Sequence, residues 1–203
     1  MRLILVRHGR TRANAQARFP LSSAVPLDET GREQVTRTGQ RIAASDFRPE
    51  IIHSSDAERA LQTAALLRDS IAPGLRIAPR PDLRELDWGE LRGRSTSTGP
   101  AGEAAYARWQ RGPMDPLPGG EGLADVAARV ARVLRLITDD GRPAIVVSHA
   151  VTLTVLTAQA NGWDLAETWR SHRAHLSPGQ FHLLDLSAPQ GAAGPLPHRP
   201  RTT

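Results

Sequence analysis

The stretch that decides the fold is Arg2-Leu-Ile-Leu-Val-Arg-His-Gly9, at the N-terminus. Its four consecutive apolar residues, Leu3 to Val6, predict a short buried strand. Arg7, His8 and Gly9 then place a cation, an imidazole and a residue that allows close backbone approach directly after that strand. In open α/β sheets, ligands bind beyond the carboxyl ends of the strands, so this triplet is a candidate site.

Strand-like and helix-like segments alternate along the rest of the chain. The apolar patterns predict strands over 50–53, 75–78, 143–147 and 181–186, and helices over 29–44, 57–71, 101–111, 125–137 and 151–160. Pro143-Ala-Ile-Val-Val147 is continuously apolar and is predicted to be a central strand covered on both faces. The alternation predicts an α/β fold, a three-layer α/β/α sandwich whose wound sheet is mostly parallel and carries helices on both faces.

The chain has 203 residues, with no internal repeat and no recognisable linker, which favours a single domain over residues 1–186. The segment at about 94–123 is rich in Gly, Pro, Ser and Thr, and we expect it to form a flap over the pocket. Residues 187–203 are rich in Pro and Gly without a core pattern, and we expect a mobile C-terminal tail there.

The composition excludes several classes of function. The chain has no Cys, which removes thiol catalysis, disulfide scaffolds and Cys-based zinc sites. All 26 basic residues are Arg, but they are interleaved with acidic residues and aromatics make up only 4%, so we expect no nucleic-acid partner. The longest apolar run near the N-terminus is too short for a signal peptide or a membrane span, so we expect a cytoplasmic protein without a membrane partner.

Polar residues from distant segments are predicted to meet at one edge of the sheet. Arg7 and His8 follow the first strand, Arg59 lies one helical turn beyond the second, and His149 follows the fourth. Together with Asn14 they form a cradle for an anion, and phosphate fits because forked guanidinium donors bind its oxygens in pairs. The neighbouring Arg cations disfavour protonation of His8, which makes it a competent nucleophile.

Five segments stand in order along residues 1–186: Leu5-Val-Arg-His-Gly-Arg-Thr11 with Asn14, Ser54-Ser-Asp-Ala-Glu-Arg-Ala60, Leu83-Arg-Glu-Leu-Asp-Trp-Gly89, Pro118-Gly-Gly-Glu121 with Arg129, and Val146-Val-Ser-His149. Together they resemble the motifs of the histidine phosphatase superfamily, in its phosphoglycerate mutase-like branch (branch 1). The triplet alone is a weak signal, whereas five motifs in the family's order are specific. The resemblance implies the phosphoglycerate mutase-like version of the α/β/α sandwich.

The resemblance also implies the roles of individual residues. His8 is the nucleophile that becomes a phosphohistidine, and Glu85 protonates the leaving oxygen and then activates water. Asp87 and Glu90 are nearby carboxylates that compete with Glu85 for this role. His149 is the third catalytic residue, and the phosphate-binding residues are Arg7, Arg59, Asn14 and His149. No metal or other cofactor is implied, because Arg and His groups neutralise the phosphoryl oxygens.

The chain departs from the family pattern at three positions. Arg10 stands where relatives usually have Glu, Gln or Asp, Asp28 where Thr or Ser is common, and Gly122 where Ser is common. One hypothesis makes Arg10 a substrate contact that attracts a second anionic group. The alternative is that Arg10 points outward and pairs with a surface acid such as Asp28 or Glu29.

The resemblance leaves the reaction open between hydrolysis and transfer. Mutase members carry a longer insertion at the site mouth and a Trp before the Asn, whereas this chain is short and has Ala13 there. We therefore expect a metal-independent phosphatase acting on a small phosphorylated metabolite, as a monomer or homodimer. The alternatives are phosphoglycerate mutase-type transfer, a protein phosphohistidine phosphatase, which predicts an open and shallow mouth, and a non-enzymatic phospho-ligand binding module, which predicts a lost catalytic residue.

Two further pairs of residues have alternative interpretations. His172 and His175 are three residues apart and could share a helical face to bind a metal, although no carboxylate nearby completes the set. Trp88 and Trp109 fit either a wall of the substrate site or ordinary core packing.

Overall fold

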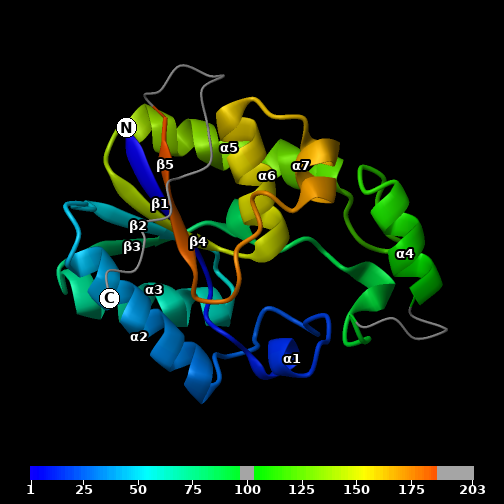
Figure 1. Cartoon of the computed structure of the whole chain (residues 1–203), viewed down its shortest axis with the longest axis horizontal. Helices are drawn as coiled ribbons and strands as arrows, with labels where there is room; N and C mark the ends of the chain where they lie inside the picture. Colours follow the sequence, from blue (N-terminus) through cyan, green and yellow to red (C-terminus); the bar gives the residue numbers. More distant parts are fainter. Residues whose placement is uncertain (97–102, 187–203) are drawn as a thin grey trace, which may run out of the picture.

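The computed structural model describes residues 1–96 and 103–186. The tail expected at 187–203 lies outside the described residues, as do residues 97–102 of the expected flap. A five-stranded sheet runs through the middle of the molecule, with helices on both faces (Figure 1). The predicted α/β/α sandwich is confirmed.

The sheet has the strand order β3-β2-β4-β1-β5, which places β4 at its centre as the sequence predicts. The first four strands in the chain are parallel to one another, and the last pairs antiparallel with β1 at one edge. The strands are β1 (Arg2–Arg7), β2 (Ile51–Ser54), β3 (Arg76–Pro79), β4 (Ala144–Ser148) and β5 (Phe181–Asp185).

The predicted helices and strands are all present, with ends within three residues of those expected. The corresponding helices are α2 (Glu29–Ala43), α3 (Glu58–Ile71), α4 (Glu103–Arg111), α5 (Leu123–Asp140) and α6 (Ala150–Asn161). The sequence patterns missed α1 (Arg12–Ala15) and α7 (Leu165–Ser171), which have four and seven residues. Helices this short are held by their caps, Thr11 and Asp164, rather than by a long apolar stripe.

Successive residues of β1 point to opposite faces of the sheet and enter two separate cores. Leu3 and Leu5 pack in the core beneath α5 and α6, whereas Ile4 and Val6 pack beneath α2 and α3. Figure 1 shows these two helix pairs on opposite sides of the sheet. A strand with apolar residues on both faces therefore fits only between the two helical layers, which explains the continuous apolar run.

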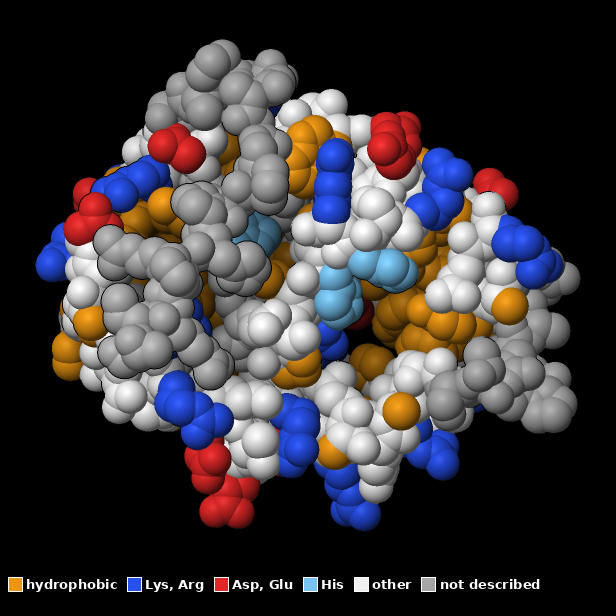
Figure 2. Space-filling view, viewed as in Figure 1, with side chains coloured by type: hydrophobic (Ala, Val, Ile, Leu, Met, Phe, Trp, Pro, Cys, Tyr) orange, Lys and Arg blue, Asp and Glu red, His pale blue; other side chains and the backbone are white. Residues whose placement is uncertain are grey.

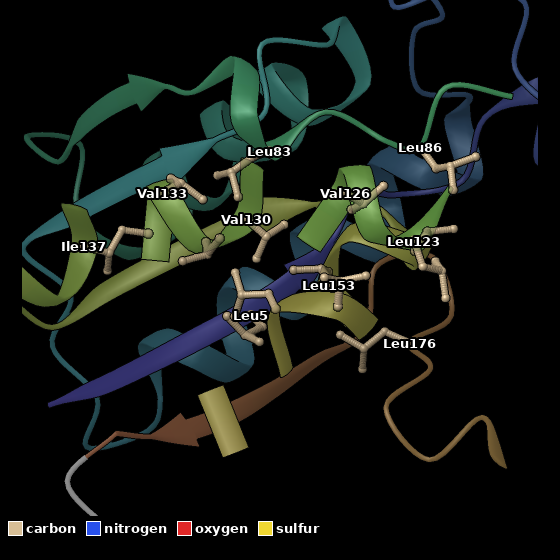
Figure 3. Packing of buried hydrophobic residues seen from close by; sticks show 14 of the residues in the cluster. Leu5, Leu83, Leu86, Leu123, Val126, Val130, Val133, Ile137, Leu153 and Leu176 are labelled. Carbon is tan, nitrogen blue, oxygen red and sulfur yellow. The ribbon is translucent and has the colours of Figure 1, made fainter. Parts of the chain in front are cut away.

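The helix α5 holds the core together next to the segment that carries Glu85. Its buried stripe is Val126, Val130, Val133 and Ile137, and the helix ends at Gly141, whose left-handed φ of 70° suits glycine. Leu83 and Leu86 belong to the same cluster, as Figure 3 shows. The two Leu side chains thus anchor both ends of the short Arg84–Glu85 segment in the core.

None of the helices in residues 1–96 and 103–186 is both long and apolar enough to cross a membrane.

A buried histidine in the central sheet makes the stability depend on pH. His53 in β2 is only 1% exposed, and its Nδ1 accepts a hydrogen bond from Arg80 Nε at 3.3 Å. Burial, with the Arg80 charge beside it, lowers the pKa of His53 to about 4. In the unfolded chain a histidine titrates at about 6.5. Above pH 6.5 the ring is neutral in both the folded and the unfolded chain, and its contribution to stability is fully present. As the pH falls from 6.5 toward 4, only the unfolded chain binds the proton, so the free energy of unfolding falls.

We predict that His53→Leu, which removes the titrating group, flattens this dependence. Between pH 7 and pH 4 the free energy of unfolding should fall by about 2–3 kcal/mol less in the variant than in the wild type. Urea denaturation at several pH values measures the difference. Parallel curves for the two proteins would show that His53 does not titrate differently in the folded and unfolded chains.

Candidate active site

The carboxyl ends of three parallel strands bring the candidate catalytic residues together. His8 follows β1 and His149 follows β4, and their ring centroids lie 5.0 Å apart. Arg59, in the first turn of α3, donates from Nε to His8 Nε2 at 3.3 Å. Arg7, His8, Arg59 and Glu85 line one cavity of about 240 Å³. Figure 2 shows a hollow on this face of the molecule, with His and hydrophobic side chains at its rim.

The ring of His8 is held in one orientation by its own backbone neighbour. Its Nδ1 lies 2.7 Å from the carbonyl oxygen of Gly9, so Nδ1 carries the proton and donates it. In the neutral ring, the lone pair is then on Nε2, the atom that faces Arg59. Gly9 is required here because a Cβ would collide with the carbonyl oxygen of Gly31.

Both histidines of the site are neutral near pH 7. His8 is 4% exposed and His149 is fully buried. Burial, reinforced by the positive charges of Arg59 and Arg7, lowers the pKa of each well below its usual range. A neutral, oriented imidazole whose lone-pair nitrogen faces the guanidinium groups that would hold a phosphate can attack an electrophilic phosphorus.

The site contains buried nitrogen atoms that have no protein partner among the described residues. Ser55 Oγ forms a hydrogen bond with His149 Nε2 at 2.9 Å and also accepts one from the Ala57 amide. The donor Arg7 Nε and the ring nitrogen His149 Nδ1 are both buried and have no hydrogen-bond partner in the described part of the chain. Unsatisfied buried donors are costly, and an anion with several oxygens would satisfy them.

The two guanidinium groups are also incompletely compensated. Burial lowers the pKa of both Arg7 and Arg59, and the charge of Glu85 opposes the effect. Arg7 uses NH1 to donate to the carbonyl oxygen of Leu176 at 2.7 Å. Two buried cations near a single carboxylate leave a net positive charge, which favours binding of a dianion.

The carboxylate of Glu85 lies at the first turn of α6, directly beyond His149. Its oxygens face the amides of Val151 and Thr152 at 3.5 and 3.4 Å, and accept from the Leu86 amide at 3.0 Å. Glu85 lines the 240 Å³ cavity and also a larger neighbouring cavity of about 550 Å³. A group bound in either cavity would therefore meet this carboxylate.

The larger cavity joins the smaller one at Arg59, Glu85 and Trp88, which line both. Its walls carry many charged side chains, but the positive and negative charges nearly balance. Apart from Arg59, the cations that line it form ion pairs, Arg84 with Asp56, Arg92 with Asp87, and Arg129 with Glu121.

Arg129 fixes the segment that carries Glu85, a role that the sequence motif alone did not reveal. Its NH1 donates to the carbonyl oxygens of Asp82 and Arg84 at 2.8 and 2.6 Å. One guanidinium group thus binds the backbone just before Glu85 at two points. The other side of the fork binds Glu121, which in turn accepts from the Asp87 amide at 2.9 Å. The acidic segment is thus held on both sides of Glu85.

Arg10 lies on the loop after β1 and Asn14 lies in α1, and only one of the two lines a cavity. Asn14 lines the smaller cavity, and its side-chain oxygen accepts from the Thr11 amide at 3.1 Å. Arg10 lines neither cavity, and it donates to Asp28 and Thr30 at 2.8 Å each. Of the two hypotheses for Arg10, the structure corresponds to the outward ion pair with Asp28 rather than to the substrate contact, because a nearer acid holds the guanidinium.

The competing carboxylates are placed less favourably than Glu85. Asp87 lines the larger cavity, where it is paired with Arg92. Glu90 lines neither of the two cavities.

The remaining candidates are two tryptophans and two histidines. Trp88 lines both cavities, whereas Trp109 is 4% exposed and packs behind it in the core. The rings of His172 and His175 lie 6.3 Å apart. Within residues 1–96 and 103–186, no cluster of three or more His, Asp or Glu residues is arranged to hold a metal ion.

The motifs that surround this site match a known family over nearly the whole described chain. The family model of the histidine phosphatase superfamily (branch 1) matches residues 3–187. The chain belongs to this superfamily. The resemblance seen in the sequence is therefore confirmed.

Relatives within the superfamily include both mutases and phosphatases. A 2,3-bisphosphoglycerate-dependent phosphoglycerate mutase of Rhizobium etli is 31% identical over 195 residues, covering 91% of this chain and 92% of the relative. A mycobacterial glucosyl-3-phosphoglycerate phosphatase, solved with VO3, has a TM-score of 0.76 at 26% identity, with 91% and 92% covered. The α-ribazole phosphatase of Shigella flexneri has a TM-score of 0.77 at 26% identity, with 91% and 90% covered.

We predict that Arg129→Lys, which keeps the charge but loses the fork, lowers turnover in a manner that depends on the leaving group. If Glu85 is the proton donor, its displacement in the variant should slow hydrolysis of an alkyl phosphate about tenfold or more. General acids typically contribute about 10²- to 10⁴-fold to such rates, and the variant should lose part of that contribution. p-Nitrophenyl phosphate, whose leaving group needs no proton, should lose much less, and Glu85→Gln should give the same ordering. Steady-state kinetics on both substrates measures this.

Arg132→Lys is the matched control, because Arg132 lies on the same helix and pairs with the exposed carboxylate of Asp82. It should leave both rates near those of the wild type. Equal losses on the two substrates in Arg129→Lys, together with lowered stability, would indicate a purely structural role.

Proposed function

We propose that this protein is a metal-independent phosphatase that hydrolyses a small-molecule phosphate monoester through a phosphohistidine at His8. The observation that carries the proposal is the state of His8: buried, neutral, with Nδ1 bonded to Gly9 and Nε2 directed at Arg59. With Nδ1 engaged by Gly9, Nε2 is the nitrogen that faces the anion cradle, which also contains Arg7 and His149.

In the first half-reaction, His8 Nε2 attacks phosphorus. The new N–P bond forms as the P–O bond to the leaving group breaks, and the leaving oxygen takes a proton from Glu85. In the second half-reaction, a water oxygen attacks phosphorus and gives its proton to Glu85. The N–P bond then breaks, which releases inorganic phosphate and restores His8. The guanidinium groups of Arg7 and Arg59 stabilise the charge on the transferred phosphoryl oxygens throughout.

Three observations favour hydrolysis over transfer. The structures similar to this chain include phosphatases acting on quite different esters, glucosyl-3-phosphoglycerate and α-ribazole phosphate. A phosphoglycerate mutase must also hold a second anionic group, yet the ion pairs of the larger cavity already compensate its cations other than Arg59. Ala13, in place of the Trp that mutases carry, supports the same conclusion.

Mutase-type transfer is the second candidate, because a relative that covers most of this chain is named a phosphoglycerate mutase. The length of the chain does not argue against it, contrary to our expectation from sequence. The aligned 195 residues make up 92% of that relative, so the two proteins are of similar length.

We predict that His8→Ala abolishes both turnover and the covalent intermediate. The reason is that, among the described residues of the cradle, His8 has the ring nitrogen Nε2 that faces the phosphate-binding Arg59. Labelled substrate, an alkaline quench that preserves phosphohistidine, and mass analysis of the peptide measure the intermediate. His172→Asn is the control, since His172 lines neither cavity and its left-handed φ of 54° is tolerated by Asn. More than a tenth of the wild-type rate in His8→Ala would exclude the covalent mechanism.

We predict that the protein releases inorganic phosphate from monoesters with excess EDTA present. The Arg and His groups supply the charge neutralisation that a metal would otherwise provide. A panel of phosphate esters, read as released phosphate, is the measurement. In parallel, 3-phosphoglycerate is supplied with 2,3-bisphosphoglycerate. Interconversion of phosphoglycerates faster than phosphate release would identify a mutase instead, and loss of activity that magnesium or zinc restores would contradict the metal-free mechanism.

A further inference from the structure

The smaller cavity has two chemically different sides. One side is the cationic cradle of Arg7, His8 and Arg59. The other is formed by four aromatic side chains that all line the same cavity, Phe19, Trp88, Tyr106 and Trp169, which we call the aromatic wall. The cradle can hold a phosphoryl group, but it offers no reason for an aromatic surface of this extent beside it.

The aromatic wall is assembled from four distant parts of the chain. Phe19 follows α1, Trp88 follows the Glu85 segment, Tyr106 belongs to α4, and Trp169 belongs to α7. Phe19 lies with its ring centroid 4.4 Å from Trp88 and 5.2 Å from Tyr106. Trp109 supports the wall from behind.

The contacts of Trp109 make the wall one rigid unit. Its ring packs 5.6 Å from Trp88, 6.0 Å from Tyr106 and 5.3 Å from Trp169. Trp109 is buried and lines neither of the two cavities, so its role is packing. Tyr106 and Trp169 are only half-buried, and each presents part of its ring to the cavity.

The concentration of aromatic residues here is unusual for this chain. The whole sequence has only eight Phe, Tyr and Trp residues, and five of them are the wall and its support. The rest of the lining includes the small side chains of Ala13, Ala150 and Val151 and the polar side chains of Thr11, Asn14, Arg18, Thr96 and His175. A core that merely needed filling could use aliphatic residues, which this chain has in excess.

The wall offers little to a polyhydroxylated ligand. The polar groups of the wall are few: the Tyr106 hydroxyl, which already bonds the Gln110 side chain, and the indole N–H groups of Trp88 and Trp169. A ligand with many hydroxyls would lose hydrogen bonds to water there without replacement. A planar ring would instead gain offset-stacked or edge-to-face contacts with the rigid faces of the wall.

We propose that the leaving group of the substrate carries a planar aromatic or heteroaromatic ring that packs on the aromatic wall. The inference rests on the proposed function, since it places the phosphoryl group in the cradle and the ester oxygen beside Glu85. The preferred substrates are then phosphate monoesters of ring-bearing alcohols, of the kind exemplified by nucleoside monophosphates. Polar parts of the leaving group beyond the ring have the larger, charged cavity available through Glu85 and Trp88.

Adenosine 5′-monophosphate and ribose 5-phosphate make a matched test pair, because both have the same primary ester oxygen and differ in the ring. Stacking of a base on aromatic side chains is worth about five- to 150-fold in binding. We therefore expect kcat/KM to be about tenfold or more higher for adenosine 5′-monophosphate, mainly through KM. Glucose 6-phosphate should resemble ribose 5-phosphate.

Binding is measured separately from turnover in His8→Ala, by titration calorimetry with the same three phosphates. Adenosine 5′-monophosphate should bind about tenfold more tightly than ribose 5-phosphate. Equal dissociation constants would overturn the aromatic leaving-group site. Tighter binding of adenosine 5′-monophosphate without hydrolysis of any ester by the wild-type protein would keep the ring site and overturn the proposed phosphatase.

Trp169→Leu and Tyr106→Leu should each remove most of the preference for the ring-bearing phosphate. Trp163→Leu is the matched control, because Trp163 stacks on Arg173 at 3.6 Å and does not line either of the two cavities. It should retain the wild-type ratio between the two phosphates. A ratio that survives in both wall variants would mean that the ring binds elsewhere, in the larger cavity, and would also overturn the inference.

Discussion

The site depends on the parallel register between β1 and β4. Arg7 lies opposite Ser148 in that register, and the His8 amide donates to the Ser148 carbonyl at 3.0 Å. This pairing makes His8 and His149 neighbours although 140 residues separate them in the chain. A shift of one residue would exchange the two faces of β1, moving Leu3 and Leu5 out of one core and His8 away from His149. Because both faces of the strand are buried, the apolar packing enforces the register on which the chemistry depends.

The electrostatics of the site follow from burying more cation than anion. Arg7 and Arg59 are held in a largely buried cradle, and Glu85 is the carboxylate that acts on both. Burial, reinforced by the excess of positive charge, keeps the two imidazoles neutral, and Arg7 Nε is a buried donor available to an oxygen of a phosphoryl group. One arrangement therefore favours binding of a dianion and also keeps His8, the proposed nucleophile, unprotonated.

The position of the single carboxylate is correspondingly demanding. Leu83 and Leu86 anchor the segment around Glu85 in the core, and Arg129 binds the backbone just before it. The same segment continues into Trp88, the residue shared by both cavities. Glu85, the proposed proton donor, and the beginning of the aromatic wall are thus fixed by one short stretch of chain, which would couple the proposed chemistry to the shape of the proposed leaving-group site.

The sequence by itself determined most of the helices and strands and the candidate site residues, because the apolar patterns and motifs that mark them are local. Apolar runs marked the strands, a repeated stripe marked α5, and the order of motifs selected His8, Arg59, Glu85 and His149. Tertiary structure alone decided the rest. The pairing of Arg10 with Asp28, the grip of Arg129 on two carbonyl oxygens and the assembly of the aromatic wall from four segments all depend on contacts between residues distant in the chain. Such contacts leave no periodicity or spacing in the sequence, because each partner belongs to a different local segment. Only the packing of the sheet and its helices brings these segments together.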